Sequence, residues 1–166
     1  MDKTLSILEV PPSKYRDFSC GYSQLDEYLT RFAKANHKKG IGKTFVLLSD
    51  SLVAGYYTVS MGEIQFSSIP ENLRAGLPKY PIPVARIGRL AVHAGFQGKG
   101  FGKYLLIDAL RRIVDASQTI AAYAVVVDAK DDSSKAFYTR YGFASYEDES
   151  LSMFLSLATF KDAYGA

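Results

Sequence analysis

Hydrophobic residues occur along this chain in two patterns, short continuous runs and a spacing of three or four residues. The clearest change from the first pattern to the second falls between Val84 and Ile113. Residues 84–92 form an apolar run, in which Leu90-Ala91-Val92 is typical of a buried β-strand. From residue 105 onward, apolar residues recur every three or four positions, which predicts an amphipathic helix. The apolar positions of that helix are Leu105, Leu106, Ala109, Leu110 and Ile113.

Other segments follow the same two patterns. Short apolar runs predict strands over residues 4–10, 44–49, 52–60, 119–127, 143–146 and 151–157. Helices are expected from a cap at Ser23 to just before Gly40, over residues 69–79 after an opening Pro70, and over residues 133–141 before Gly142. The run 119–127 is typical of a strand covered on both faces, so with the run 84–92 it predicts a parallel βαβ unit. We therefore expect a mixed α/β fold.

Length and composition narrow the class of protein. With 166 residues, of which 48% are hydrophobic and 22% charged, the chain fits one soluble globular domain over residues 1–166. It contains neither an apolar stretch long enough to span a membrane nor a signal-peptide pattern. The single Cys20 excludes an intramolecular disulfide and favours the cytoplasm. A net charge of +3 permits an anionic partner without requiring one.

Three alternating glycines mark the start of the central helix, in the segment QGKGFGK at residues 97–103. Glycine allows a tight bend and a close ligand, and the first N–H groups of a helix are unpaired at its positive end. We interpret this segment as a cradle for phosphate; a glycine-rich turn without a ligand is the alternative. The spacing fits neither a Walker loop, which needs glycine at position 97, nor a dinucleotide loop, so Q-x-x-G-x-G remains.

A second motif lies in AFYTRYGF at residues 136–143. Together with Q-x-x-G-x-G, it resembles the GNAT superfamily of acetyl-CoA-dependent N-acetyltransferases, whose FYxxxGF segment follows a buried strand. The order of strand, glycine loop, amphipathic helix, apolar strand and FYxxxGF matches as well. The resemblance implies a central, mostly antiparallel sheet with one parallel strand pair, flanked by helices.

Dispersed residues are similar to one GNAT branch, the acetyltransferase toxins of type II toxin–antitoxin modules. They include the segments 20–21, 25–29, 44–46, 55–57, 89–92 and 127–129. The resemblance implies that the chain acetylates the amino group of aminoacyl-tRNA and so blocks translation. A ribbon-helix-helix antitoxin is then the expected protein partner. Toxins of this kind often pair, so a homodimer is also expected.

Acetyl transfer from a thioester needs an anchored donor, a polarised carbonyl and a proton for the departing thiolate. The cradle supplies the first, and a backbone N–H of Leu90 or Val92 is expected to supply the second. Tyr138 is the candidate acid, because a phenol is protonated at neutral pH; Tyr141 is second choice, and a merely packed aromatic is the alternative. No metal ion is expected. The residues expected to contact acetyl-CoA are Leu90, Ala91, Val92, Gln97, Gly98, Lys99, Gly100, Phe101, Gly102 and Lys103.

A general base is harder to identify. His93 and Glu63 end predicted strands, but we interpret them as a turn histidine and a solvated carboxylate. Many GNAT enzymes carry asparagine where this chain has Asp131, which we expect to face water. Asp128 either replaces part of that role or caps a helix. A site without a base favours an α-amino acceptor, since such an amine is partly deprotonated near neutral pH.

A tRNA acceptor would need a positive surface, because phosphate contacts dominate affinity. The candidate residues are Arg31, Lys34, Lys38, Arg86 and Arg89; a solvated face is the alternative for the first three. Two further functions stay open. The same chemistry could serve a small-molecule amine or a protein N-terminus, and the chain could be a non-catalytic module that binds coenzyme A.

Overall fold

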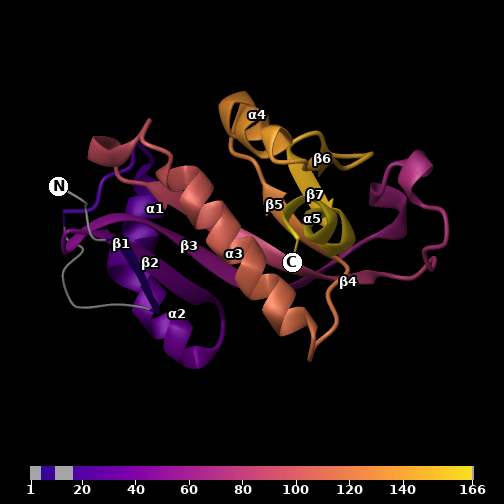
Figure 1. Cartoon of the computed structure of the whole chain (residues 1–166), viewed down its shortest axis with the longest axis horizontal. Coiled ribbons are helices and arrows are strands. Elements are labelled where there is room, and N and C mark those ends of the chain that lie inside the picture. Colours follow the sequence, from indigo (N-terminus) through magenta and orange to yellow (C-terminus); the bar gives the residue numbers. More distant parts are fainter. Residues whose placement is uncertain (1–4, 10–16, 166) are drawn as a thin grey trace. The chain divides into compact units, whose positions relative to one another are not determined.

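The computed structural model describes residues 5–9 and 17–165, which form a seven-stranded sheet and accompanying helices (Figure 1). The strands are β1 Leu5–Glu9, β2 Lys43–Ser49, β3 Leu52–Ile64, β4 Ile82–Val92, β5 Ala124–Asp128, β6 Ala144–Ser145 and β7 Ser152–Ser156. Their order is β1-β2-β3-β4-β5-β7-β6, with β4 and β5 as the one parallel pair. The expected mixed α/β fold is thereby confirmed.

The helices are α1 Ser23–Glu27, α2 Ala33–Lys39, α3 Phe101–Ser117, α4 Asp132–Arg140 and α5 Leu157–Tyr164. A π-helical turn, Tyr28–Phe32, joins α1 to α2, and short 3-10 turns lie at Phe66–Ser68, Glu71–Leu73 and Ala94–Phe96. None of the helices in the described ranges is long and apolar enough to cross a membrane.

Packing divides the chain into two compact units. Unit 1 comprises residues 1–60 and 87–109, and unit 2 comprises residues 61–86 and 110–166. The single domain expected from the sequence remains a prediction.

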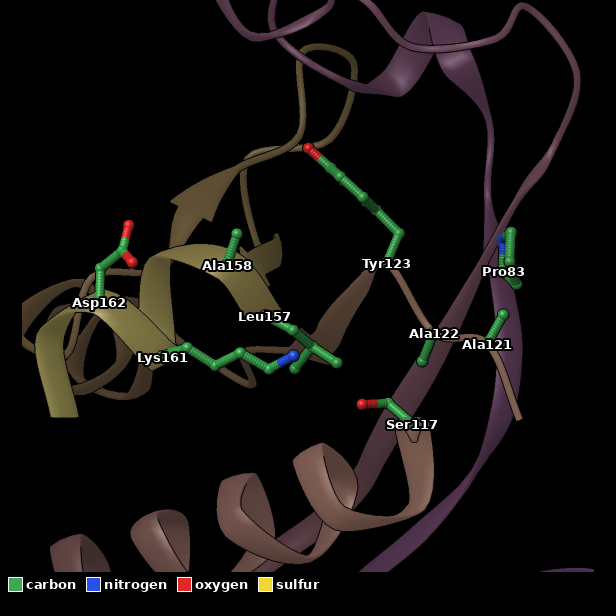
Figure 2. Close-up of a pocket in the computed structure, with 9 residues that line it drawn as sticks. All are labelled: Pro83, Ser117, Ala121, Ala122, Tyr123, Leu157, Ala158, Lys161 and Asp162. Carbon is green, nitrogen blue, oxygen red and sulfur yellow. The ribbon is translucent and has the colours of Figure 1, made fainter. Parts of the chain in front are cut away.

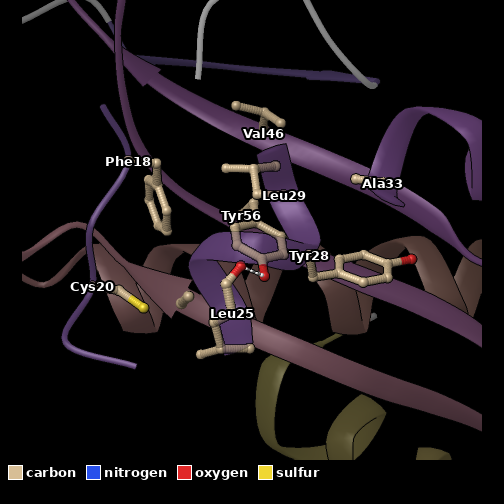
Figure 3. Packing of buried hydrophobic residues seen from close by; sticks show 9 residues of the cluster. Phe18, Cys20, Leu25, Tyr28, Leu29, Ala33, Val46 and Tyr56 are labelled. Atoms are coloured by element: carbon tan, nitrogen blue, oxygen red, sulfur yellow. Dashed lines mark hydrogen bonds between the residues drawn. The ribbon is translucent and has the colours of Figure 1, made fainter. Parts of the chain in front are cut away.

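The core of unit 1 lies between the helical segment 23–39 and strands β2, β3 and β4. Figure 3 shows this cluster, in which the Tyr56 hydroxyl donates a 2.6 Å hydrogen bond to the carbonyl of Leu25. Burial raises the pKa of Tyr56 above its usual value, so the phenol stays neutral. The cluster comprises Phe18, Cys20, Leu25, Tyr28, Leu29, Ala33, Val46, Tyr56 and Ala91.

Of the two ends predicted for the first helical segment, the C-terminal one is confirmed and the N-terminal one is wrong. Gly40 ends it in the left-handed conformation, at φ 73°, as predicted. Ser23 is not the cap: Tyr22 occupies that position, and Ser23 is already helical. The carbonyl of Tyr22 accepts hydrogen bonds from the N–H groups of Leu25 and Asp26, which starts the helix one residue earlier than expected.

The core of unit 2 packs β3, β4, β5 and β7 through Ile64, Ile69, Ile82, Val84, Ala124, Val126 and Phe154. Strand β5 begins at residue 124, so its predicted start at 119 is wrong. The reason is the turn that closes α3, in which the N–H groups of Thr119 and Ile120 bond to the carbonyl of Ala116. Ile120 is consequently exposed.

The helix predicted over residues 69–79 is wrong. The segment has only the three-residue turn Glu71–Leu73, and Gly76 adopts φ 79°, which interrupts any helix. The Arg74 side chain donates to the carbonyl of Ile69 at 2.6 Å, so a side chain rather than a helical N–H satisfies that carbonyl.

The C-terminus holds a helix that the hydrophobic pattern did not reveal. Strand β7 ends at Ser156, and the Ser156 hydroxyl accepts the N–H of Thr159 at 3.2 Å to cap α5. The predicted strand over residues 143–146 shrinks to the two residues of β6.

Candidate functional site

The glycine segment follows β4 and leads into α3, as the sequence predicted. Gly98 and Gly100 have φ of 76° and 82°. A Cβ at either position would have open space around it, so glycine is needed for conformation rather than for room. Helix α3 begins at Phe101, and the Tyr104 N–H bonds to the Gly100 carbonyl at 3.1 Å. The preceding N–H groups belong to the first turn, which has no intrahelical partners and suits an anion.

The side chain of Gln97 holds this segment in place. Its Nε2 donates to the carbonyl of Cys20 at 3.1 Å and to that of Val92 at 3.0 Å. The N–H of Ala94 also donates to the carbonyl of Ser19, at 2.8 Å. Gln97 therefore ties the loop to the end of β4 and to the segment before α1. Any contact that Gln97 makes with a cofactor is left to its backbone.

Aromatic rings and lysines surround the loop. Phe96 and Phe101 are stacked with their centroids 5.6 Å apart, and the Lys99 ammonium lies 5.7 Å from the Phe96 ring. The side chains of Lys99 and Lys103 are exposed. The segment thus combines unpaired helix N–H groups with two positive charges, which favours a diphosphate.

Two contacts fix the backbone on either side of the loop. A Cβ on Gly55 would lie 2.6 Å from the carbonyl oxygen of Ala91, so β3 approaches β4 more closely than a side chain allows. The buried Tyr57 hydroxyl donates to Asp108 at 2.5 Å, which anchors α3 on β3. The two residues are 51 positions apart in the sequence, so the helical pattern alone could not reveal this hydrogen bond.

Tyr138 lies on α4 in unit 2. The residue is 8% exposed, with its ring packed edge-on against Phe137 and Phe143 at centroid distances of 5.1 and 5.4 Å. Its hydroxyl forms no hydrogen bond with any described residue. Burial raises the pKa of Tyr138. The phenol is therefore neutral, and its proton is not engaged by any described residue.

The FYxxxGF segment owes its shape to the end of α4. The carbonyl of Tyr138 accepts the N–H groups of Tyr141 and Phe143, and Gly142 takes φ 95° to turn the chain. Phe143 is buried in the core, whereas Phe137 is only half-buried.

Each of the four residues named above as a possible base or cofactor contact has a hydrogen-bond partner, and for Glu63 it is the side-chain amide of Gln65 at 3.4 Å. Glu63 is exposed, and the Nδ1 of His93 accepts the N–H of Gly95 at 3.0 Å. Asp131 does not simply face water, because it caps α4 by accepting the N–H of Ser134 at 2.8 Å. Asp128 is not a helix cap: it ends β5 and accepts from Arg86 at 2.7 Å and from Ser152 at 2.9 Å.

Some of the candidate RNA-binding residues form ion pairs with carboxylates of this chain, and others do not. Arg31 pairs with Glu27 at 2.7 Å, one helical turn away, and Lys34 and Lys38 are exposed on α2. Arg86 is paired with Asp128, so its charge is largely neutralised. The Arg89 guanidinium lies 3.5 Å from the centroid of the Tyr28 ring.

A hollow of about 560 Å³ lies in unit 2, and none of the residues predicted to bind or act on a substrate lines it (Figure 2). Its lining combines apolar side chains and Tyr123 with the polar side chains of Ser117, Lys161 and Asp162. It contains none of the residues expected to bind acetyl-CoA. Among residues 5–9 and 17–165 there is also no cluster of side chains that could hold a metal ion.

Comparison with known proteins places these features in context. The family model described as the acetyltransferase (GNAT) domain matches residues 31–159. A protein of Mycobacterium tuberculosis named "tRNA-acetylating toxin" is 37% identical over 146 residues, covering 88% of this chain and 86% of that protein.

Two solved structures share the fold over nearly their whole length. A mutant of KacT is 26% identical with a TM-score of 0.90, covering 96% of this chain and 99% of its own. AtaTR bound with acetyl-CoA is 25% identical with a TM-score of 0.83, covering 99% of each chain.

Proposed function

Since the chain belongs to the GNAT acetyltransferase family, we propose that it transfers the acetyl group of acetyl-CoA to the α-amino group of aminoacyl-tRNA and so acts as a toxin that blocks translation. The observation that carries this proposal is the 37% identity, over 88% of the chain, to the tRNA-acetylating toxin of M. tuberculosis. The proposed acceptor, aminoacyl-tRNA, follows from this identity. Because charged tRNA is found in the cytoplasm, the protein is proposed to act there.

The loop at residues 97–103 binds the diphosphate of acetyl-CoA. Its support is the pair of left-handed glycines, the open first turn of α3 and the exposed Lys99 and Lys103. The AtaTR structure, which has the same fold, is described as bound to acetyl-CoA. The strand end Leu90–Val92 accommodates the thioester.

Transfer is direct. The free α-amine attacks the thioester carbonyl, a C–N bond forms, and a backbone N–H of Leu90 or Val92 stabilises the oxyanion. The C–S bond then breaks, and the thiolate takes the proton of the Tyr138 hydroxyl. Burial raises the pKa of Tyr138, so the hydroxyl keeps its proton until the thiolate takes it.

No side chain is needed to deprotonate the acceptor amine before it attacks. The proton left on the nitrogen of the tetrahedral adduct goes to water, and water returns a proton to the Tyr138 phenolate. The Nδ1 of His93 is occupied by Gly95, and Glu63 is exposed, so neither is prepared to take a proton. An α-amine of pKa near 8 is partly deprotonated at neutral pH, whereas a lysine amine is not. This chemistry supports an α-amino acceptor.

The exposed cations Arg31, Lys34 and Lys38 hold the RNA backbone. A ribbon-helix-helix antitoxin neutralises the toxin, and the toxin works as a homodimer. Both of these partner assignments follow from the resemblance to toxin–antitoxin modules.

Labelled acetyl-CoA tests the proposal when it is incubated with charged tRNA, uncharged tRNA and a panel of free amines. Label should appear on charged tRNA alone and should be released with the aminoacyl group after ester hydrolysis. Label on a free amine in preference to charged tRNA would refute the acceptor, and no transfer to any acceptor would refute catalysis.

A further inference from the structure

Arg89 stands apart from the other arginines that could bind RNA. It is half-buried on β4, and the Cζ of its guanidinium lies 3.5 Å from the centroid of the Tyr28 ring. It forms no ion pair and no hydrogen bond with any residue in the described ranges. Arg31 and Arg86, by contrast, each bond a carboxylate at 2.7 Å.

The ring under Arg89 is held by an unusual piece of helix. Tyr28 is the first residue of the π-helical turn, and its carbonyl accepts the N–H of Ala33, five residues ahead. The Thr30 hydroxyl donates to the carbonyl of Asp26 at 3.0 Å, so a side chain provides a hydrogen bond to this carbonyl just before the π-helical turn. Turns of this kind are rare and are frequent at functional sites.

The ring itself cannot move freely. Tyr28 is 6% exposed and packs in the cluster of Leu29 and Tyr56, with its hydroxyl directed away from Tyr56 (Figure 3). That hydroxyl accepts a hydrogen bond from Asn36 at 3.4 Å. Arg89 therefore rests on a fixed surface, with its guanidinium over the ring and its N–H groups bonded to none of residues 5–9 and 17–165.

A merely structural role explains this arrangement poorly. Half-burying a cation costs solvation, which a carboxylate or a hydrogen bond normally offsets, and an apolar side chain would fill the same space. A planar guanidinium stacked on a ring keeps its fork of donors in one orientation, which matches two oxygens of a phosphate. The arrangement is that of a preorganised anion site.

We propose that Arg89 binds a backbone phosphate at the 3′ end of the acceptor strand of tRNA, and so brings the esterified amino acid to the strand end that follows it. This inference rests on the proposed function. Arg89 precedes Leu90 by one residue, a rise of about 3.3 Å along a strand. The exposed Lys34 and Lys38 add attraction at long range, whereas Arg89 fixes position.

The test compares Arg89→Leu, Arg89→Lys and the matched control Arg111→Leu, which removes an exposed arginine on α3. Three quantities are measured for each: KM for aminoacyl-tRNA, KM for acetyl-CoA, and the affinity for uncharged tRNA between 50 and 200 mM salt, a range of about fourfold. Arg89→Lys keeps the charge but loses the planar fork, so it separates charge from geometry.

We expect Arg89→Leu to raise KM for aminoacyl-tRNA at least tenfold with KM for acetyl-CoA unchanged. The slope of log affinity against log salt should fall by about 0.7, the value for one phosphate contact on a single strand. Arg89→Lys should recover the slope but only part of KM, and Arg111→Leu should match the wild type.

An unchanged salt slope in Arg89→Leu, or an equal rise in both KM values, would overturn the inference. Should the wild type acetylate no charged tRNA, the proposed function would fall, and the slope measured on uncharged tRNA would still decide whether Arg89 contacts a phosphate. If Arg89→Leu does not fold, Arg89→Lys decides: a KM equal to that of the wild type would refute the role of the fork.

Discussion

Replacing Tyr138 with phenylalanine separates catalysis from stability more cleanly than any other change in this chain. The substitution removes one oxygen and keeps the ring between Phe137 and Phe143. That oxygen bonds no described residue, so its loss leaves no orphaned partner. We therefore expect the free energy of unfolding to change by at most about 0.5 kcal/mol.

The rate of acetyl transfer should fall much further. General-acid catalysis contributes a factor of about 10²–10⁴, which corresponds to about 3–5 kcal/mol of activation free energy. Single-turnover transfer from labelled acetyl-CoA to charged tRNA measures this directly, with thermal unfolding of the same preparation as the control. A rate within tenfold of the wild type would refute the role of Tyr138 as acid.

The pH dependence gives an independent check on the same residue. Because burial raises the pKa of Tyr138 above 10, the phenol stays protonated throughout the neutral and mildly alkaline range. The wild-type rate should therefore rise as the acceptor amine loses its proton and then stay level to about pH 10, near the ordinary phenol pKa. A decline that begins near pH 8 and is absent in Tyr138→Phe would contradict this reasoning.

Three further predictions concern packing, the loop and charge. Gly55→Ala should destabilise the protein by about 1–3 kcal/mol in denaturant unfolding, because its Cβ would lie 2.6 Å from the carbonyl of Ala91, and an unchanged midpoint would contradict that close approach. Gln97→Leu should weaken acetyl-CoA binding about tenfold by calorimetry, since two carbonyls lose their donor and the loop its attachment; equal affinity would show that the amide is dispensable. Double charge reversal, Arg31→Glu with Lys34→Glu, should reduce tRNA acetylation with little effect on acetyl-CoA affinity, and wild-type activity that is equal at low and high salt would count against an RNA acceptor.

The elements around the site follow closely from the sequence, because local patterns determine them. The apolar run of β4, the glycines at 98 and 100 and the periodicity of α3 each predict the structure that is observed. Gly40 and Gly142 mark helix ends by their need for positive φ. These signals lie within a few residues of the feature they predict.

The predictions that were wrong or incomplete concern features set by side-chain contacts or by residues distant in the sequence. The helix expected over residues 69–79 is replaced by short turns because Arg74 reaches back to a carbonyl, which periodicity does not encode. The segment 119–123 is apolar without being strand, since its first N–H groups close α3. Likewise, the partners of Asp128 and of Gln97 are distant in sequence, and only the fold brings them together.

The bond from Gln97 to Cys20 also has a consequence for synthesis. It joins residues 77 positions apart, so the glycine loop cannot take its final shape when its partner segment first leaves the ribosome. At about 5–20 residues per second, the interval is about 4–15 s. A nascent chain therefore passes through a period in which the segment before its first helix has been made but the glutamine that holds the phosphate-binding loop has not.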